Sequence, residues 1–439
     1  MKKRIIAAVL TALMLSASLA ACSGSKTDNA KGADKAQTVT LNQNAANTAA
    51  ATDNQTTQTK ADSDSKQSDA AYTGGYSGGM IDTTDLFSSR DMKQEADTSD
   101  AKSLTLSDGK DVTVTEEGVY IITGSASNAS IIVDAADDAK VQLALSGVSI
   151  TNDAAPAIYV KNADKVFITT ADGSDNKLTV SGSFTADGDT NTDAVIFAKD
   201  DIVLNGMGTL TISSTDNGIS GKDDIKITGG TINITSASDA IEANDSIVMA
   251  DGNITIDTGK DGFHAENDDD NSTGYIYIGG GSVTVNASGD GIQATTVLQI
   301  DGGTVTTNSS EGLEATYIQI NGGTVNITAS DDGINASSKS SAYNVTAEFN
   351  GGEINIDMGQ GDTDAIDSNG DLYIRGGTFN INAQSPFDYD GQCEYTGGTI
   401  YVNGELTNEI TNQMMGGHGG MGGPGGNGGP NGMGGPGGM

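Results

Sequence analysis

Several residue types that often identify a function are scarce in this chain. Its 439 residues include no tryptophan, 5 prolines, 2 cysteines and 2 histidines. Little proline together with 60 glycines disfavours long helices, because glycine weakens a helix interior, and favours strands joined by tight corners. The histidines are His264 and His418, so no Ser-His-Asp grouping can be read from the sequence, and no catalytic residue is predicted.

Basic residues are also few. The chain has 22 Lys and Arg and 59 Asp and Glu, which gives a net charge of -37. A chain this acidic is not expected to bind nucleic acid, because phosphates are bound by Lys and Arg. Cations and neutral polymers are compatible partners.

The two cysteines, Cys22 and Cys393, are not expected to form a disulfide, since Cys22 lies in a segment typical of an export signal. Charged residues followed by an apolar run to Ala21 indicate a signal peptide over residues 1–21. Leu19-Ala20-Ala21-Cys22 resembles the lipobox of bacterial lipoproteins, which implies cleavage before Cys22 and lipid attachment to its sulfur. We expect an exported monomer held on the outer side of the bacterial cell membrane by lipid alone. An ordinary signal peptide is the alternative.

Composition divides the remaining chain into three parts. Residues 22–80 have almost no large apolar side chains and are predicted to be a disordered tether. Residues 81–412 are predicted to fold, with a short helix over 84–95 that caps the first coil. Residues 413–439 are rich in Gly, Met and Pro and are predicted to be a disordered tail.

A repeat that returns about every 21 to 24 residues dominates the C-terminal half. Each unit has an acid, a small residue, a large apolar residue, a polar residue and Ala, followed by two alternating strands on either side of a Gly pair. One such unit cannot bury its apolar face alone, so the units must stack. The repeat therefore predicts an all-β solenoid in which equivalent residues form columns.

Three columns define the surface and core of the predicted solenoid. The acid column includes Asp239, Asp261, Asp290, Glu311, Asp332 and Asp364. The polar column, three residues later, includes Glu242, His264, Gln293, Glu314, Asn335 and Asp367. The apolar column between them includes Ile219, Ile241, Phe263, Ile292, Leu313, Ile334 and Ile366.

Stacked carboxylates are expected to bind calcium. Neighbouring coils lie about 4.8 Å apart, and partly buried carboxylates at that spacing repel by roughly 3.5 kcal/mol. Calcium takes oxygens at about 2.4 Å and fits between two of them, whereas His264 makes its coil a poor calcium candidate. A solvated corner rich in turn-forming Asp is the alternative. The candidate ligands are Asp239, Glu242, Asp261, Asp290, Glu311, Glu314, Asp332, Asp364 and Asp367.

Two insertions at one corner predict a groove. They separate Ala265 from Ile276 and Ala336 from Ala347, and the coils between them carry no such insertion. Three coil steps span roughly 14 Å, and tyrosine offers both a ring face and a hydroxyl to a sugar. Insertions that simply occupy a permissive corner are the alternative. The predicted carbohydrate-binding residues are Tyr275, Tyr277, Gln293, Glu314 and Tyr317.

The segments over residues 116–169 and 217–235, which contain EEGVYIITGSASNASIIVDAADDAKVQLALSGVSITNDAAPAIYVKNADKVFIT and NGISGKDDIKITGGTINIT, are the most distinctive. They resemble a family of bacterial carbohydrate-binding domain proteins with clostridial cellulose- and pectin-binding members. The resemblance covers roughly residues 84–412. It implies a right-handed parallel β-helix of roughly a dozen coils, similar to polysaccharide lyases, with bound calcium and no established catalysis.

The expected function is therefore non-catalytic binding of a cellulose- or pectin-like polysaccharide by a calcium-containing, surface-anchored β-helix. Two alternatives remain open at this point: a polysaccharide lyase or glycoside hydrolase, and a structural surface adhesin without a sugar ligand. Paired carboxylates could serve hydrolysis, but in a chain this acidic they carry little information.

Overall fold

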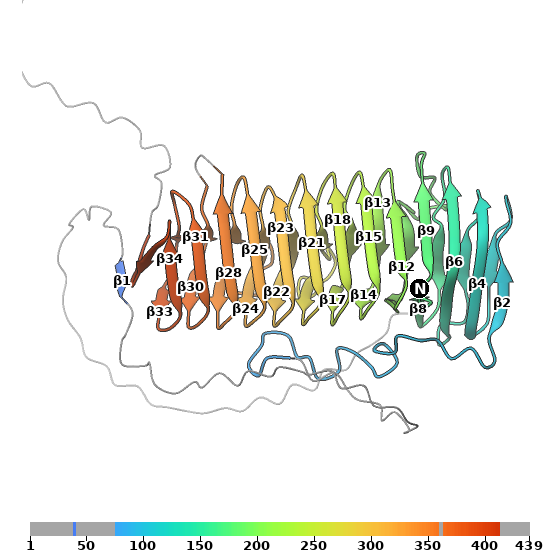
Figure 1. Cartoon of the computed structure of the whole chain (residues 1–439), viewed down its shortest axis with the longest axis horizontal. Helices are drawn as coiled ribbons and strands as arrows, with labels where there is room; N and C mark the ends of the chain where they lie inside the picture. Colours follow the sequence, from blue (N-terminus) through green and yellow to red (C-terminus); the bar gives the residue numbers. More distant parts are fainter. Residues whose placement is uncertain (1–37, 41–74, 360–362, 413–439) are drawn as a thin grey trace, which may run out of the picture. The chain divides into compact units, whose positions relative to one another are not determined.

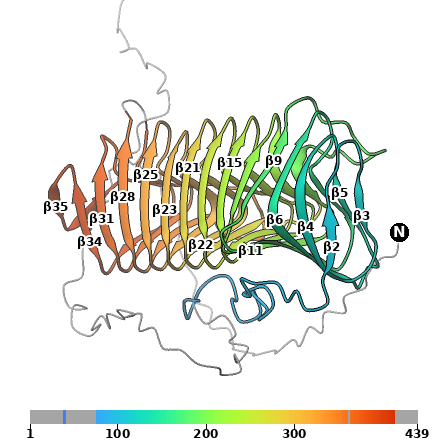
Figure 2. The same ribbon diagram turned by 45° about the vertical axis from the view of Figure 1, so that its right-hand side comes forward.

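The chain winds through strand after strand into a parallel β-helix (Figures 1 and 2). The computed structural model describes residues 38–40, 75–359 and 363–412. Cys22, the signal segment, most of the tether and the C-terminal tail lie outside the described residues. Within the described residues the structure consists of strands and turns without a helix, which confirms the all-β prediction. No helix of the described part is long and apolar enough to cross a membrane.

The coils stack in parallel register on three faces. The first face carries the acid and polar columns, because the strand that follows each acid aligns with its equivalent in the next coil. For example, Ile241 pairs with Phe263 and Glu242 with His264. Its strands are β3 (Val112–Val114), β5 (Ile131–Asp134), β7 (Ile158–Asn162), β10 (Ala194–Ala198), β13 (Asn217–Gly221), β16 (Ile241–Ala243), β19 (Phe263–Ala265), the first parts of β22 (Ile292–Ile300) and β24 (Leu313–Ile320), β26 (Ile334–Ala336), β29 (Ile366–Ser368) and β32 (Asp388–Tyr389).

The second face follows each first-face strand around a corner. Where the corner is short, as in β22 and β24, one continuous strand serves both faces. The strands of this face are β2 (Lys102–Thr105), the first parts of β4 (Gly118–Ser127) and β6 (Lys140–Asn152), β8 (Lys165–Thr170), β11 (Asp201–Gly206), β14 (Asp224–Ile227), β17 (Ser246–Met249), β20 (Tyr275–Ile278), the second parts of β22 and β24, β27 (Thr346–Phe349), β30 (Asp371–Ile374) and β33 (Cys393–Tyr395).

The third face follows the glycine corner. At Gly303 the backbone φ is 80°, and an added Cβ would lie 2.7 Å from the carbonyl oxygen of Gly281 in the preceding coil. Only glycine fits that conformation and that close approach without strain. The strands are the second parts of β4 and β6, β9 (Asp175–Val180), β12 (Thr209–Ser213), β15 (Thr231–Ser236), β18 (Asn253–Thr258), β21 (Ser282–Ala287), β23 (Thr304–Ser309), β25 (Thr324–Ala329), β28 (Glu353–Met358), β31 (Thr378–Asn382) and β34 (Thr399–Val402).

The interior is a continuous stack of aliphatic and aromatic side chains. Every member of the predicted apolar column is 0% exposed, so that prediction is confirmed. Burial of one such side chain contributes about 1.5–3 kcal/mol, and stacking repeats this contribution along the solenoid. At the C-terminal end, β34 turns back into β35 (Glu405–Thr407), and β36 (Glu409–Thr411) pairs antiparallel with β1 (Thr38–Thr40).

Residues 75–101 form an N-terminal strap along the second face, drawn in blue in Figures 1 and 2. The predicted helix over 84–95 is wrong: this segment consists of turns and bends, and several of its polar groups bond to the β-helix. Lys226 Nζ donates to the Leu86 carbonyl at 2.6 Å, and the Ile81 N–H donates to Gln299 Oε1 at 2.7 Å. The strap thus lies beside central coils, and not over the first coil.

Apolar contacts hold the strap in place. Leu86 and Phe87 are buried against Val248 and Tyr277, with the Phe87 and Tyr277 ring centroids 6.5 Å apart. The described strap also includes residues 75–80, which were predicted to belong to the tether; the Met80 N–H donates to Gln319 Oε1 at 2.9 Å. The strap therefore covers an apolar stripe of the second face that alternation alone would assign to solvent.

Candidate functional site

The acid column is held together through its own carboxylates. Asp239 Oδ1 accepts the backbone N–H of Asp261 at 3.1 Å, and Asp261 Oδ1 accepts that of Asp290 at 2.8 Å. Asn217 Oδ1 likewise accepts the backbone N–H of Asp239 at 2.9 Å. One side-chain oxygen of each of these residues thus fixes the next coil. This explains the short Asp and Asn side chains here and leaves the second oxygen of each Asp for other contacts.

The first carboxylate cluster contains Asp239, Asp261 and His264, whose ligand atoms all lie within 4.8 Å of one another. Lys260 Nζ lies 2.9 Å from Asp239 Oδ2, and His264 Nδ1 lies 3.5 Å from the same oxygen. Burial raises the pKa of Asp239, but the bonds and charges of His264 and Lys260 outweigh it and lower the pKa overall. This cluster already holds a cationic partner within the chain.

The second cluster contains Asp290, Glu311 and Glu314, again with ligand atoms within 4.8 Å. Gln293 Nε2 donates to Asp290 Oδ2 and to Glu314 Oε2, both at 2.7 Å. Burial, followed by repulsion from Glu311, raises the pKa of Asp290 to about 8. Burial and the charge of Glu314 raise the pKa of Glu311 to about 7.

Lys339 balances only part of this negative charge. Its Nζ lies 2.8 Å from Glu314 Oε2, and although burial opposes the change, this contact helps to lower the pKa of Glu314. The donor set of the second cluster consists of oxygens, which suits a hard cation such as calcium or magnesium. A bound divalent cation would relieve the repulsion that the raised pKa values of Asp290 and Glu311 report.

An unpartnered amide oxygen lies in the next coil of the polar column. Asn335 aligns with Glu314, is 9% exposed, and donates from Nδ2 to Glu311 Oε2 at 3.0 Å. Its Oδ1 is buried without a hydrogen-bond partner. The polar column of the sequence contained Asn335, but its type alone did not single it out as a ligand.

The other predicted metal ligands are more dispersed. Burial raises the pKa of Asp332 to about 6 and that of Asp367 to about 7. Asp332 Oδ1 accepts the Asp364 N–H at 3.0 Å, and Glu242 Oε2 accepts Asn217 Nδ2 at 2.9 Å. Within the described residues, Asp332, Asp364, Asp367 and Glu242 belong to neither three-residue cluster.

The predicted open groove between the two insertions is wrong. Asn271 of the first insertion donates to Ser341 of the second at 3.0 Å, and Ser340 Oγ donates to the Asn271 carbonyl at 2.6 Å. Ser340 N–H also bonds Thr316 Oγ1 at 2.8 Å in an intervening coil. The insertions therefore meet over the coils between them, joined by hydrogen bonds from the side chains of Asn271 and Ser340.

The predicted carbohydrate-binding residues consequently fall at different places. Gln293 and Glu314 lie in the second carboxylate cluster on the first face. Tyr277 was expected to face solvent, but it is 0% exposed beneath the strap and its hydroxyl lies 3.1 Å from Asp301 Oδ2. Tyr275 is partly buried against the same apolar cluster. Tyr317, by contrast, lines a pocket on the second face.

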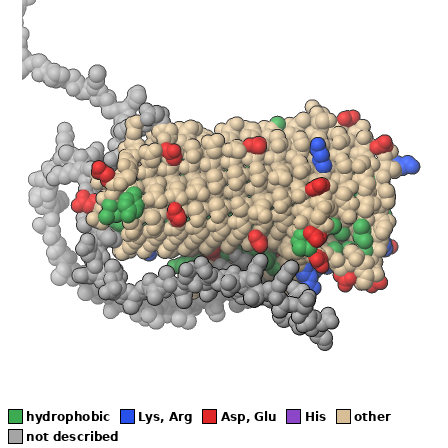
Figure 3. Space-filling view, in the orientation of Figure 1, with side chains coloured by type: hydrophobic (Ala, Val, Ile, Leu, Met, Phe, Trp, Pro, Cys, Tyr) green, Lys and Arg blue, Asp and Glu red, His purple; other side chains and the backbone are tan. Residues whose placement is uncertain are grey.

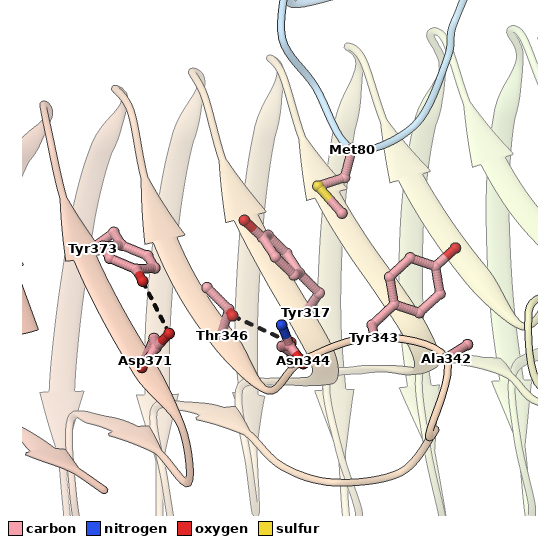
Figure 4. A pocket seen from close by; sticks show the side chains of 8 residues that line it. All are labelled: Met80, Tyr317, Ala342, Tyr343, Asn344, Thr346, Asp371 and Tyr373. Atoms are coloured by element: carbon pink, nitrogen blue, oxygen red, sulfur yellow. Dashed lines mark hydrogen bonds between the residues drawn. The ribbon is translucent and has the colours of Figure 1, made fainter. Parts of the chain in front are cut away.

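That pocket has a volume of about 390 Å³ and lies where the strap begins (Figure 4). Tyr317 and Tyr373 project from β24 and β30, the strands on either side of β27 on the second face, Tyr343 comes from the second insertion, and Met80 of the strap forms one wall. All three rings are half-buried, so each keeps an accessible surface. The full lining consists of Met80, Tyr317, Ala342, Tyr343, Asn344, Thr346, Asp371 and Tyr373.

Hydrogen bonds orient two of these rings. Tyr373 donates to Asp371 Oδ2 at 2.9 Å, and Tyr317 donates to Glu348, which also binds Arg375. Burial, together with the bond to Glu348, raises the pKa of the Tyr317 hydroxyl well above its usual value. The phenol therefore acts as a fixed hydrogen-bond donor, and its ring offers a stacking surface.

Tyr343, Tyr373 and Asp371 also line the pocket but were not predicted from the sequence. Tyr343 lies within the second insertion, between Ala336 and Ala347, and an aromatic residue in a loop that interrupts the repeat is the signal that could have identified it. Tyr373 and Asp371 are half-buried outward residues of β30, and strand alternation does not indicate that they share a pocket.

Comparisons with known proteins found a matching family model, a relative and a solved structure. A family model described as carbohydrate-binding domain-containing protein matches residues 108–363 and 317–415. A carbohydrate-binding domain-containing protein of Acetivibrio thermocellus is 40% identical over 124 residues, which are 28% of this chain and 43% of that protein. This chain thus matches less than half of the relative's length. The solved structure of a polysaccharide lyase-like protein from C. thermocellum, a gadolinium derivative, shares 30% identity with a TM-score of 0.47, covering 50% of this chain and 96% of the other.

The raised carboxylate pKa values predict a pH dependence of stability. Asp290, Glu311 and Asp367 hold protons more tightly in the folded state than in the unfolded chain, where such groups titrate near pH 4. The folded state therefore binds more protons, and stability present below about pH 4 is lost as pH rises towards about 8. In EDTA, thermal melting is expected to show a midpoint that falls between about pH 5 and pH 8, and less steeply in Asp290→Asn.

The matched control is Asp257→Asn, which removes a carboxylate from the third face. An Asp290→Asn profile as steep as that of the control would contradict the assignment of this pH dependence to the second cluster.

Proposed function

The chain belongs to the carbohydrate-binding domain-containing family, and on this premise we propose that it binds polysaccharide without transforming it. The observation that carries the proposal is the pocket formed by Tyr317, Tyr343 and Tyr373. Half-buried rings can stack on the apolar faces of sugar rings, and Asp371 and Asn344 supply oxygens for sugar hydroxyls. The ligand class we favour is a cellulose- or pectin-like plant polysaccharide.

We propose that a calcium ion binds at the second carboxylate cluster. Support comes from the oxygen-only second cluster, from its raised pKa values and from the unpartnered Asn335 Oδ1 in the adjoining coil. Asp290, Glu311, Glu314, the Gln293 amide oxygen and Asn335 are the ligands we propose. Such an ion would stabilise the stack and would let an anionic polymer approach an acidic face.

A lipid anchor on Cys22 is proposed for the exported protein. The support is the lipobox-like Leu19-Ala20-Ala21-Cys22. The attached lipid would hold the β-helix on the outer side of the cell membrane, joined to it by a long polar segment. Mass spectrometry of the mature N-terminal peptide tests this point, since an unmodified Cys22 would refute it.

The pocket is tested with soluble oligosaccharides. Tyr317→Ala and Tyr373→Ala each remove one stacking face and are expected to weaken binding of cellohexaose or oligogalacturonate about tenfold, as measured by isothermal titration calorimetry. Tyr401→Ala, on the third face, is the matched control. Unchanged affinity in both pocket variants would exclude this pocket as the binding site.

Calcium is tested by direct titration into the chelator-stripped protein. Glu311→Gln keeps the size of the side chain but removes its charge, so calcium affinity is expected to fall at least about tenfold. The Asp257→Asn control should leave the affinity unchanged. A wild-type protein that takes up no calcium, or a Glu311→Gln variant that binds it normally, would rule out this site.

A further inference from the structure

The third face carries an ordered array of outward side chains. Successive coils pair without a register shift from β12 to β34, so outward residues form straight rows along the axis. Neighbouring coils are about 4.8 Å apart, and alternate residues of one strand are about 6.8 Å apart. The middle row is Thr211, Asn233, Thr255, Thr284, Thr306, Asn326, Asn355, Asn380 and Tyr401.

The rows on either side have the same character. One contains Thr209, Thr231, Asn253, Ser282, Thr304, Thr324, Glu353, Thr378 and Thr399. The other contains Ser213, Thr235, Asp257, Asn286, Asn308, Thr328, Asp357 and Asn382. Hydroxyl and amide groups therefore dominate the whole array.

This face is nearly free of charge. Between β12 and β31 the charged members of the three rows are Asp257, Glu353 and Asp357, although the chain as a whole has a net charge of -37. Figure 3 shows the same face with few acidic or basic side chains and little apolar surface. These rows contain no Lys or Arg that could bind an anionic polymer. An uncharged polymer can approach them because the electrostatic field of the face is weak.

Side-chain ladders fix part of the array before any ligand binds. Asn355 Nδ2 donates to Asn326 Oδ1 at 2.9 Å, and Asn380 Nδ2 donates to Asn355 Oδ1 at 2.7 Å. Asn326 Nδ2 in turn lies 3.3 Å from Thr306 Oγ1. Because these side chains are already ordered along the axis, a ligand that contacts them loses less conformational entropy on binding.

The described part of the chain leaves this face open. The strap lies along the second face, and the two insertions meet at the corner between the first and second faces. Outward residues of the third face are exposed or half-buried from β12 to β34.

We propose that the third face binds the surface of an ordered, uncharged polysaccharide, separately from the tyrosine pocket. Parallel chains of a neutral glycan present hydroxyls at regular intervals, and a repeating array of hydroxyls and amides can bond to many of them at once. Each contact is weak in water, so affinity comes from their number and from pre-ordering. The inference rests on the proposed carbohydrate-binding function and assigns a second surface and ligand state to it.

The test uses the full mature chain and microcrystalline cellulose as the probe, with depletion from solution as the readout. The double variant Thr255→Glu with Thr306→Glu places charges two coils apart on the middle row. Carboxylates there would have to lose water against a neutral surface, so cellulose binding is expected to weaken at least about tenfold. Binding of soluble oligosaccharide by the pocket should be unchanged.

Two further variants make the result specific. Thr98→Glu with Thr105→Glu adds the same charge at exposed positions away from the third face and should bind cellulose as the wild type does. Thr255→Val with Thr306→Val keeps the branched shape and strand preference but removes both hydroxyls, and should weaken binding severalfold. Unchanged melting midpoints verify that each variant is folded.

The outcomes separate this inference from the proposed function. Normal cellulose binding by both third-face variants, with loss in Tyr317→Ala, would overturn the inference and place the polymer at the pocket. Wild-type protein that binds soluble oligosaccharides but not cellulose would overturn it too, while the proposed function stands. Failure to bind either form of glycan would count against both.

Discussion

Parallel register between coils is the constraint on which the rest of this structure depends. Each side chain lies about 4.8 Å from its equivalent in the next coil, so every position is repeated along the axis. Stacking of Ile on Ile or Phe builds a dry core. The same spacing makes stacked polar groups into ladders and stacked charges into a repulsive column. Equivalent positions of successive coils therefore act together, and a residue type suits a column only if its side chain can stack on copies of itself.

The first and third faces meet this requirement differently. On the first face, oxygens of Asp239 and Asp261 accept backbone N–H groups of the next coil, so part of the charge is stabilised by the chain itself. The two clusters differ in how much repulsion is left. In the first, Lys260 and His264 together lower the pKa of Asp239, whereas in the second Lys339 contacts Glu314 and the pKa values of Asp290 and Glu311 stay strongly raised. On the third face the problem is avoided, since Thr and Asn both donate and accept hydrogen bonds and can stack without net charge.

Repetition also decides what could be predicted from the sequence. The solenoid, the buried column from Ile219 to Ile366 and the glycine corners follow from spacing, and the structure confirms them. Tyr277 was misplaced because alternation tells inward from outward but does not reveal what covers an outward side chain. The strap and the two insertions do not repeat, so their long-range contacts left no periodic signal in the sequence. The tyrosine pocket depends on both, which is why only Tyr317 of its lining was anticipated.

The strap has a consequence for the order in which the protein folds. Its residues precede the β-helix in the chain, yet they form hydrogen bonds with Lys226, Gln299 and Gln319, which are synthesised much later. During synthesis from the N-terminus, the strap cannot dock until those coils have formed. Local coil-on-coil contacts can build the solenoid progressively, whereas docking of the strap closes a loop of more than two hundred residues. Completion of the second face is therefore a late step, and until then the apolar stripe around Tyr277 is open to chaperones, to other chains and to misassembly.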